Sequence, residues 1–303
     1  MPDLAIFDHA LILTGPTASG KSGLALSYAE KNNAEIISMD SMALYRTMDI
    51  GTAKPTFAER QRVPHHLIDC LEPWEKASVA WWLTEAAKAT EDILQRGKRP
   101  LIVGGTPLYL KALLCGLFKG PEIDPQLRAE LEQQPADLLY ERLQPVDPKA
   151  AARIHPNDHR RLVRALEVYL QTGKPLTDWQ QQFDAEPRSR PTPVICIELS
   201  RDELYRRIDA RVDTMMTMGW LDEVKRLLQL PQPLSKEAGQ AAGYRELADH
   251  IQGSCTLEEA ITATKIRSRQ LAKRQLTWFR HFPGLLHLSP SEAERQLALT
   301  ALP

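Results

Sequence analysis

The chain has 303 residues, of which 43% are hydrophobic and 25% charged, and its formal net charge is −1 at pH 7. This composition is typical of a globular protein, and at ~100–200 residues per domain the length predicts about two domains. Because the net charge is close to zero, it excludes nucleic-acid binding through overall charge, so any such binding must come from local basic patches.

Neither a membrane segment nor a cysteine framework is indicated. The apolar runs are too short to span a bilayer, and the first residues lack the basic segment of a signal peptide. We therefore expect no membrane partner and a cytoplasmic location. The cysteines, Cys70, Cys115, Cys196 and Cys255, lie far apart and form no C-x-x-C pair. This spacing argues against a zinc site and against a set of disulfides.

An early segment fits G-x-x-x-x-G-K-[ST], the pattern of a phosphate-binding loop. Its residues are Gly15, Pro16, Thr17, Ala18, Ser19, Gly20, Lys21 and Ser22. The apolar run 11–13 before it predicts a buried strand, and a helical pattern begins at residue 23. The alternative is a turn that matches the pattern by chance, but the flanking strand and helix favour the phosphate-binding loop.

Each part of this loop suits the binding of phosphate. Its two glycines let the backbone bend so that successive N–H groups point at phosphate oxygens. The helix N-terminus adds a partial positive charge, Lys21 supplies a full charge, and Ser22 supplies a hydroxyl for Mg²⁺. The loop therefore predicts a ligand that carries a diphosphate or triphosphate, and leaves open whether that ligand is ATP or another molecule.

A second strand is predicted over residues 34–39, and Asp40 follows it. Ligands of open α/β sheets bind at the carboxyl ends of strands, so we expect Asp40 near the phosphate-binding loop. The alternative for Asp40 is a solvated strand end or a helix cap. Residues 42–55 are polar and not periodic, which is typical of an active-site loop.

Two more strands are predicted over residues 65–69 and 100–106, the second followed by a helix over 108–114. The adjacent histidines of the first point to opposite faces, so they cannot easily share one metal ion. Between these strands Ser78 is expected to cap a helix that ends at Gly97, in which Trp81 and Trp82 pack rather than bind. Thr106, at a strand end beside a helix N-terminus, is a further candidate site residue.

The middle of the chain predicts an all-helical insertion into an α/β domain. Asn157 and Asp158 precede an expected helix over 159–172, and a strand is expected over 194–199. We expect a core domain formed by residues 1–120 and 194–303, interrupted by the insertion 121–193.

The C-terminal part is predicted to be helical, with helices over 201–218, 221–230 and 257–281 and a glycine-containing joint over 239–245. The last helix has four bases at spacings of four, four and seven, which place them on one face. They are Lys265, Arg269, Lys273 and Arg280. No acidic run of this helix neutralises them, and the neighbouring aromatics suit stacking on RNA bases. The alternative is a solvated helix face.

Taken together in this order, the motifs strongly resemble those of bacterial tRNA dimethylallyltransferases, over nearly the whole chain. The matching segments are residues 15–22, 40–41, 48–55, 104–109, 152–158, 161–167, 243–245 and 273–280. The resemblance implies a P-loop NTPase-like parallel sheet flanked by helices, with the all-helical insertion contacting tRNA.

The resemblance also implies a reaction. The exocyclic amine of the adenosine beside the anticodon attacks C1 of dimethylallyl diphosphate, and diphosphate leaves. Asp40 is then the catalytic base, Thr106 orients the diphosphate or the amine, and Mg²⁺ binds at Ser22. The target base must be flipped out of the anticodon loop. The partners are dimethylallyl diphosphate and the anticodon stem-loop of tRNA, and the protein is expected to be a monomer.

Family positions that contact tRNA can be transferred to this sequence. They are Asp40, Ser41, Met42, Ala43, Thr106, Arg128, Arg160, Arg161, Leu162, Val163, Arg164, Gln240, Ala241, Ala242, Gly243, Tyr244, Arg245, Lys273, Arg274, Gln275, Leu276, Thr277, Trp278, Phe279 and Arg280. Three other functions remain as alternatives: a small-molecule P-loop kinase, an adenine-nucleotide prenyltransferase, and a non-catalytic RNA-binding ATPase. The basic last helix favours a macromolecular acceptor over the first two, and Asp40 favours catalysis over the third.

Overall fold

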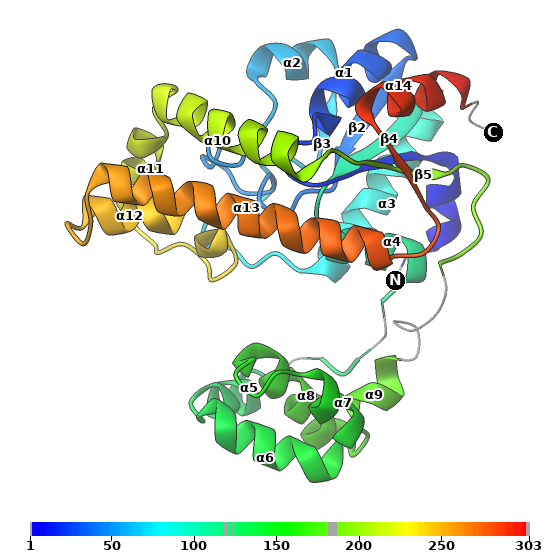
Figure 1. Cartoon of the computed structure of the whole chain (residues 1–303). Coiled ribbons are helices and arrows are strands. Elements are labelled where there is room, and N and C mark those ends of the chain that lie inside the picture. Colours follow the sequence, from blue (N-terminus) through cyan, green and yellow to red (C-terminus); the bar gives the residue numbers. More distant parts are fainter. Residues whose placement is uncertain (1, 118–119, 123, 181–186, 301–303) are drawn as a thin grey trace. The chain divides into compact units, whose positions relative to one another are not determined.

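The computed structural model describes residues 2–117, 120–122, 124–180 and 187–300 (Figure 1). It divides into two separately packed units, one formed by Met1–Leu114 with Pro187–Pro303 and the other by Cys115–Glu186. The insertion was expected over 121–193, so both boundaries lie several residues earlier in the chain. None of the helices within the described ranges combines the length and apolar character needed to cross a bilayer.

The larger unit is built on a parallel sheet of six strands in the order β3-β2-β4-β1-β5-β6. The strands are β1 (Leu11–Thr14), β2 (Ala34–Ser38), β3 (His65–His66), β4 (Arg99–Gly104), β5 (Val194–Ile197) and β6 (Leu285–Leu288). Because β1 pairs with both β4 and β5, the strand before the phosphate-binding loop lies in the middle of the sheet. This is the expected P-loop NTPase-like fold.

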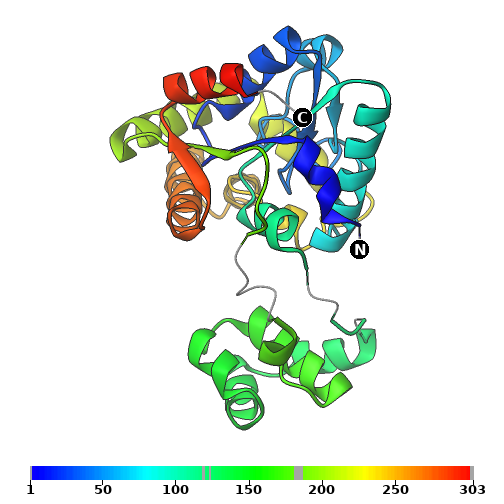
Figure 2. The same ribbon diagram turned by 90° about the vertical axis from the view of Figure 1, so that its right-hand side faces the viewer.

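Helices cover both faces of the sheet (Figure 2). In chain order they are η1 (Leu4–His9), α1 (Lys21–Lys31), α2 (Phe57–Arg62), α3 (Val79–Gln95), α4 (Pro107–Cys115), α10 (Arg201–Thr217), α11 (Trp220–Leu228), η3 (Ala238–Gln240), α12 (Tyr244–Ile251), α13 (Leu257–His281) and α14 (Pro290–Leu299). Alternate strand residues such as Leu11 and Leu13 pack against Ala25 of α1 and Leu297 of α14. Strand alternation therefore fixes which face each helix covers.

The smaller unit is entirely helical and has its own apolar core. Its helices are α5 (Pro125–Glu132), α6 (Ala136–Val146), α7 (Pro148–Arg153), α8 (His159–Thr172) and α9 (Leu176–Trp179). Leu162, Leu166 and other buried residues of α8 pack against Leu139 and Leu143 of α6. The side chain of Asp158 caps α8, and Gly173 ends it in the left-handed conformation with φ +69°. The bounds predicted for this helix are confirmed.

Two predictions about strands are wrong. The expected strand 65–69 ends after His66, because Leu67 and Asp69 have positive φ angles of 60° and 55°. The C-terminal part is not all helical, because β6 pairs with β5. The four residues of β6 were too few to predict a strand by periodicity, and tertiary pairing decides their conformation.

The segment expected as a polar active-site loop is partly packed into a second core. Tyr45 and Met48 are fully buried there, together with Trp220 of α11. The indole of Trp220 fills the space beside two glycines: a Cβ on Gly51 would lie 2.2 Å from its Nε1, and one on Gly243 2.1 Å from its ring. Because these two glycines have no side chains, the loop and the start of α12 can pack closely against the indole on α11.

We expect Gly243→Ala to lower the free energy of unfolding by about 2–5 kcal/mol. The left-handed backbone, with φ +93°, accounts for ~1–2 kcal/mol and the overlap with the indole for ~1–3. Gly253→Ala is the matched control, because it has φ +79° and nothing within 4 Å of a built Cβ. Urea unfolding of both variants checks this. Equal losses would mean that the indole does not require a glycine at residue 243.

Candidate functional site

The phosphate-binding loop joins β1 to α1, as the sequence predicts. Gly15 and Gly20 have φ angles of +147° and +91°, and Ala18 is also left-handed with φ 61°. A Cβ on Gly15 would lie 2.9 Å from the carbonyl oxygen of Ile197. The loop thus bends tightly against β5, a geometry in which successive backbone N–H groups can converge on an anion.

Lys21 lies in this loop among charged neighbours. Its ammonium donates a hydrogen bond to the carbonyl of Pro16 at 3.1 Å. Burial lowers the pKa of Lys21 to about 8, while Asp40 opposes the shift and Arg211 adds to it. Because burial disfavours the charged form, an anion placed beside the ammonium would be strongly attracted.

Asp40 and Thr106 lie at the ends of the adjacent strands β2 and β4. Asp40 is only partly buried, and its Oδ1 accepts a hydrogen bond from the amide of Met42 at 2.8 Å. Thr106 Oγ1 accepts one from the amide of Ser41 at 3.1 Å. These bonds fix the orientation of both candidate side chains at the same edge of the sheet as the phosphate-binding loop.

Arg211 of α10 completes this group, and the sequence analysis missed it. Its guanidinium donates to Thr17 Oγ1 at 3.3 Å, and burial lowers its pKa, whereas Asp40 raises it. Arg207, one turn earlier, approaches Gly20: a Cβ there would lie 3.5 Å from its Nη1. The spacing of four between these arginines was a usable signal, but only the fold shows that this face of α10 meets the loop.

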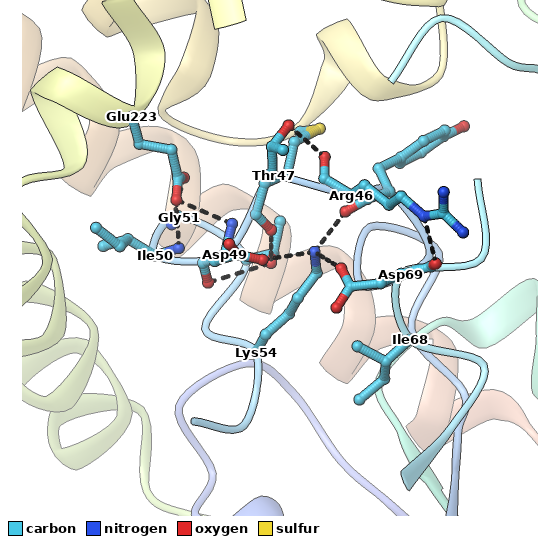
Figure 3. A network of polar contacts seen from close by, with 12 residues as sticks. Arg46, Thr47, Asp49, Ile50, Gly51, Lys54, Ile68, Asp69 and Glu223 are labelled. Atoms are coloured by element: carbon cyan, nitrogen blue, oxygen red, sulfur yellow. Dashed lines mark hydrogen bonds and ion pairs between the residues drawn. The ribbon is translucent and has the colours of Figure 1, made fainter. Parts of the chain in front are cut away.

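The segment after Asp40 is held by a buried carboxylate, shown in Figure 3. Glu223 of α11 accepts hydrogen bonds from the consecutive amides of Asp49, Ile50 and Gly51 at 2.9, 2.7 and 3.2 Å. Tyr244 donates its hydroxyl to the same carboxylate at 2.7 Å. An anion is thereby enclosed by N–H groups of the loop, which ties the loop to α11 and α12.

The same segment is also held from its other side. The buried ammonium of Lys54 binds the carbonyl of Tyr45 and the carboxylates of Asp49 and Asp69, the carboxylates at 2.8 and 2.6 Å (Figure 3). Arg60 binds the second oxygen of Asp69 at 2.5 Å. The backbone that leads away from Asp40 is therefore fixed by ionic contacts as well as by apolar packing.

Several residues transferred from the family's tRNA contacts are buried. The side chains concerned are Ala43, Leu162, Val163, Ala241, Tyr244, Gln275 and Phe279. These side chains lie in the protein interior. Trp278 stacks on Phe282, with ring centroids 4.7 Å apart and planes inclined by 14°, so the aromatic platform expected beside the basic residues is partly used internally.

The four arginines of the helical unit that are expected to contact tRNA fall into two groups. Arg128 and Arg164 both bind the fully buried carboxylate of Glu167, at 2.9 and 2.7 Å, so their guanidinium groups are fixed inside the unit. Arg160 and Arg161 are exposed on α8. Arg161 also lies 3.3 Å from the carboxylate of Asp158, one turn earlier.

Three of the four bases on the predicted basic face of α13 are paired with acids that lie outside this helix. Lys265 and Arg269 bind Asp213 and Asp209 of α10, at 2.6 and 2.8 Å. Arg280 binds Glu198 at 2.7 Å. These acids belong to other elements, so the sequence of the helix alone could not reveal them. Two bases of this helix, Lys273 and Arg274, are exposed and form no ion pair within the described ranges.

No metal cluster accompanies the adjacent histidines. His65 Nδ1 lies 2.7 Å from the carbonyl of Val63, and His66 Nε2 lies 2.7 Å from the carboxylate of Glu35. Over the residues that the structure describes, no group of three His, Cys, Asp or Glu side chains could hold an ion. The four cysteines are free.

Comparison with known proteins places the chain in a family. Residues 43–282 match the family described as IPP transferase. A tRNA dimethylallyltransferase of Citrifermentans bemidjiense is 46% identical over 269 residues, which cover 89% of this chain and 88% of that protein.

Solved structures agree. The tRNA isopentenylpyrophosphate transferase of Bacillus halodurans is 39% identical, with a TM-score of 0.69 over 95% of this chain and 94% of that one. A eukaryotic dimethylallyltransferase described as acting on tRNA is 31% identical, with a TM-score of 0.77 over 93% of this chain and 74% of that one. The chain therefore belongs to the IPP transferase family.

Proposed function

We propose that this chain transfers a dimethylallyl group from dimethylallyl diphosphate to the exocyclic amine of the adenosine 3′-adjacent to the anticodon of tRNA. The observation that carries the proposal is that Lys21, in the loop after β1, and Asp40, at the end of β2, lie at the same edge of the sheet and interact electrostatically, in a chain whose relatives are tRNA dimethylallyltransferases. A cation for the leaving group and a base for the attacking amine thus lie at the same edge of the sheet, where its strands end.

The donor half of the reaction uses the phosphate-binding loop. Lys21, Arg211 and the loop N–H groups bind the diphosphate and stabilise the charge that develops as the C–O bond breaks. The site also fits Mg²⁺ with diphosphate, because Ser22 is exposed at the start of α1 and the buried hydroxyl of Ser19 has no hydrogen-bond partner within the described residues. Ser22 would be the ligand, and bound Mg²⁺ would neutralise part of the diphosphate charge.

The acceptor half uses Asp40 and Thr106. As the adenine nitrogen bonds to C1 of the dimethylallyl group, the bond from C1 to the diphosphate oxygen breaks and Asp40 takes a proton from the nitrogen. Thr106 Oγ1 already accepts a hydrogen bond from the amide of Ser41, so its hydroxyl can donate to an oxygen of the diphosphate or to a nitrogen of the adenine.

Exposed cations are the proposed contacts to the RNA phosphates. They are Arg160 and Arg161 of the helical unit and Arg245, Lys273 and Arg274 of the larger unit. The target adenine must leave the stack to reach Asp40. A monomeric state and a cytoplasmic location remain predictions.

The direct test is to incubate the protein with radiolabelled dimethylallyl diphosphate, Mg²⁺ and unmodified tRNA. We expect label in the tRNA, one diphosphate released per group transferred, and no consumption of added ATP, because the loop holds a leaving group. Hydrolysis of ATP in proportion to product would contradict this and support the kinase alternative.

Asp40→Asn keeps the shape of the side chain and removes the base. We expect kcat to fall by ~10² or more, while the affinity for tRNA changes much less. Single-turnover kinetics over a range of pH, with filter binding of tRNA in parallel, check this. A near-normal kcat throughout the pH range would mean that Asp40 only positions the substrate.

Lys273→Ala combined with Arg274→Ala should weaken tRNA binding and flatten its salt dependence. Each lost phosphate contact reduces the slope of log K against log salt by ~0.7 for single-stranded RNA, so about one unit or slightly more is expected. Lys265→Ala with Arg269→Ala is the matched control, because these bases are already paired with Asp213 and Asp209. Filter binding over a salt series measures both slopes. The same change of slope in both double variants would refute the assignment of the phosphate contacts to Lys273 and Arg274.

A further inference from the structure

Gln275 lies on α13 among residues expected to contact RNA, but its side chain points into the protein. It is only 8% exposed, and both ends of its amide are hydrogen-bonded. Oε1 accepts from the backbone N–H of Thr17 at 2.9 Å, and Nε2 donates to the carbonyl oxygen of Gly105 at 2.7 Å. These partners assign the orientation of the amide, because one is a donor and the other an acceptor.

The two partners belong to the two segments that the proposed reaction must hold together. Thr17 lies in the phosphate-binding loop, and Gly105 immediately precedes Thr106. The junction is tight: a Cβ on Gly105 would lie 2.9 Å from both Gln275 Nε2 and the carbonyl oxygen of Gly15, and 3.5 Å from the Lys21 ammonium. One side chain from α13 therefore links the loop after β1 to the turn after β4.

Only a group that donates and accepts at once can make this link. Methionine has a similar volume but offers neither strong donor nor strong acceptor, and ionised glutamate only accepts. Either change leaves a buried backbone group without its partner, which is costly in a site from which water is excluded. Protonated glutamic acid, in contrast, has a carbonyl acceptor and a hydroxyl donor in nearly the same places as the amide.

We propose that Gln275 is a positioning residue for the donor half of the reaction, which holds the phosphate-binding loop against the Thr106 turn, and is not a contact to tRNA. This inference rests on the proposed function of the same site. Lys273 and Arg274, on the exposed side of the same helical turn, bind the RNA, while Gln275 acts on the opposite side. Both substrates are thus served by one turn of α13.

The test uses Gln275→Met, with Gln270→Met as control because Gln270 is exposed on the same helix. Inorganic diphosphate with Mg²⁺ is titrated calorimetrically into each protein, which reports on the loop whether or not prenyl transfer occurs. We expect the Kd for diphosphate and the KM for dimethylallyl diphosphate to rise about 10-fold or more in Gln275→Met. The Kd for tRNA should stay within about twofold of the wild type, and Gln270→Met should resemble the wild type throughout.

A second variant, Gln275→Glu, adds a readout that a merely structural role would not produce. The readout is the ratio of the diphosphate Kd of this variant to that of the wild type at the same pH. This ratio should be well above one at pH 8. The ratio should fall toward one as the pH is lowered toward the carboxyl range, with an ordinary pKa of ~4.3, because the protonated form restores the donor to Gly105. This variant also decides the question if Gln275→Met does not fold.

The outcomes are distinct. Unchanged diphosphate binding in folded Gln275→Met, or a ratio for Gln275→Glu that does not depend on pH, overturns the proposal. Loss of tRNA affinity with unchanged diphosphate binding would restore Gln275 as an RNA contact. If the wild type transfers no prenyl group but the diphosphate results hold, the proposed function fails while the positioning role of Gln275 stands.

Discussion

Two cations, Lys21 and Arg211, lie close to a single carboxylate, Asp40, at the carboxyl ends of the central strands. Burial lowers the pKa of both cations, and Asp40 opposes the shift in each case. The ligand-free site therefore holds more positive than negative charge in a place where water stabilises it poorly. The diphosphate of the proposed donor would supply negative charge here, which is how a loop common to many nucleotide-binding proteins could bind a leaving group.

The residues that hold this arrangement in place come from the distant C-terminal half of the chain. Arg211 and Gln275 reach the phosphate-binding loop from α10 and α13. The carboxylate of Glu223 on α11 accepts hydrogen bonds from three amides of the segment after Asp40. Since these contacts span more than 170 residues in sequence, the N-terminal motifs require the C-terminal helices for their geometry. The helices thus shape the candidate site besides covering the sheet.

Features governed by local interactions were predictable from sequence, and those governed by long-range pairing were not. The bounds of α8 and α13 follow from caps at Asp158 and Thr256, and the phosphate-binding loop follows from its motif. The strand β6 exists because β5 offers it an edge. The neutralisation of Arg269 depends on an acid of another helix, and the inward direction of Gln275 depends on two backbone groups that only the fold brings near. Burial of Tyr45 and Met48 within the expected active-site loop likewise depends on packing with Trp220.

The two faces of α13 impose a constraint on how the chain can change in evolution. An α-helix turns by about 100° per residue, so one residue inserted between the cap at Thr256 and Gln275 would swing the buried amide toward solvent and turn an exposed position toward the phosphate-binding loop. Only a change of about seven residues, close to two full turns, restores the helical phase. The length of this stretch should therefore be inherited almost unchanged, whereas its exposed side chains other than the proposed RNA contacts Lys273 and Arg274 are free to vary in identity.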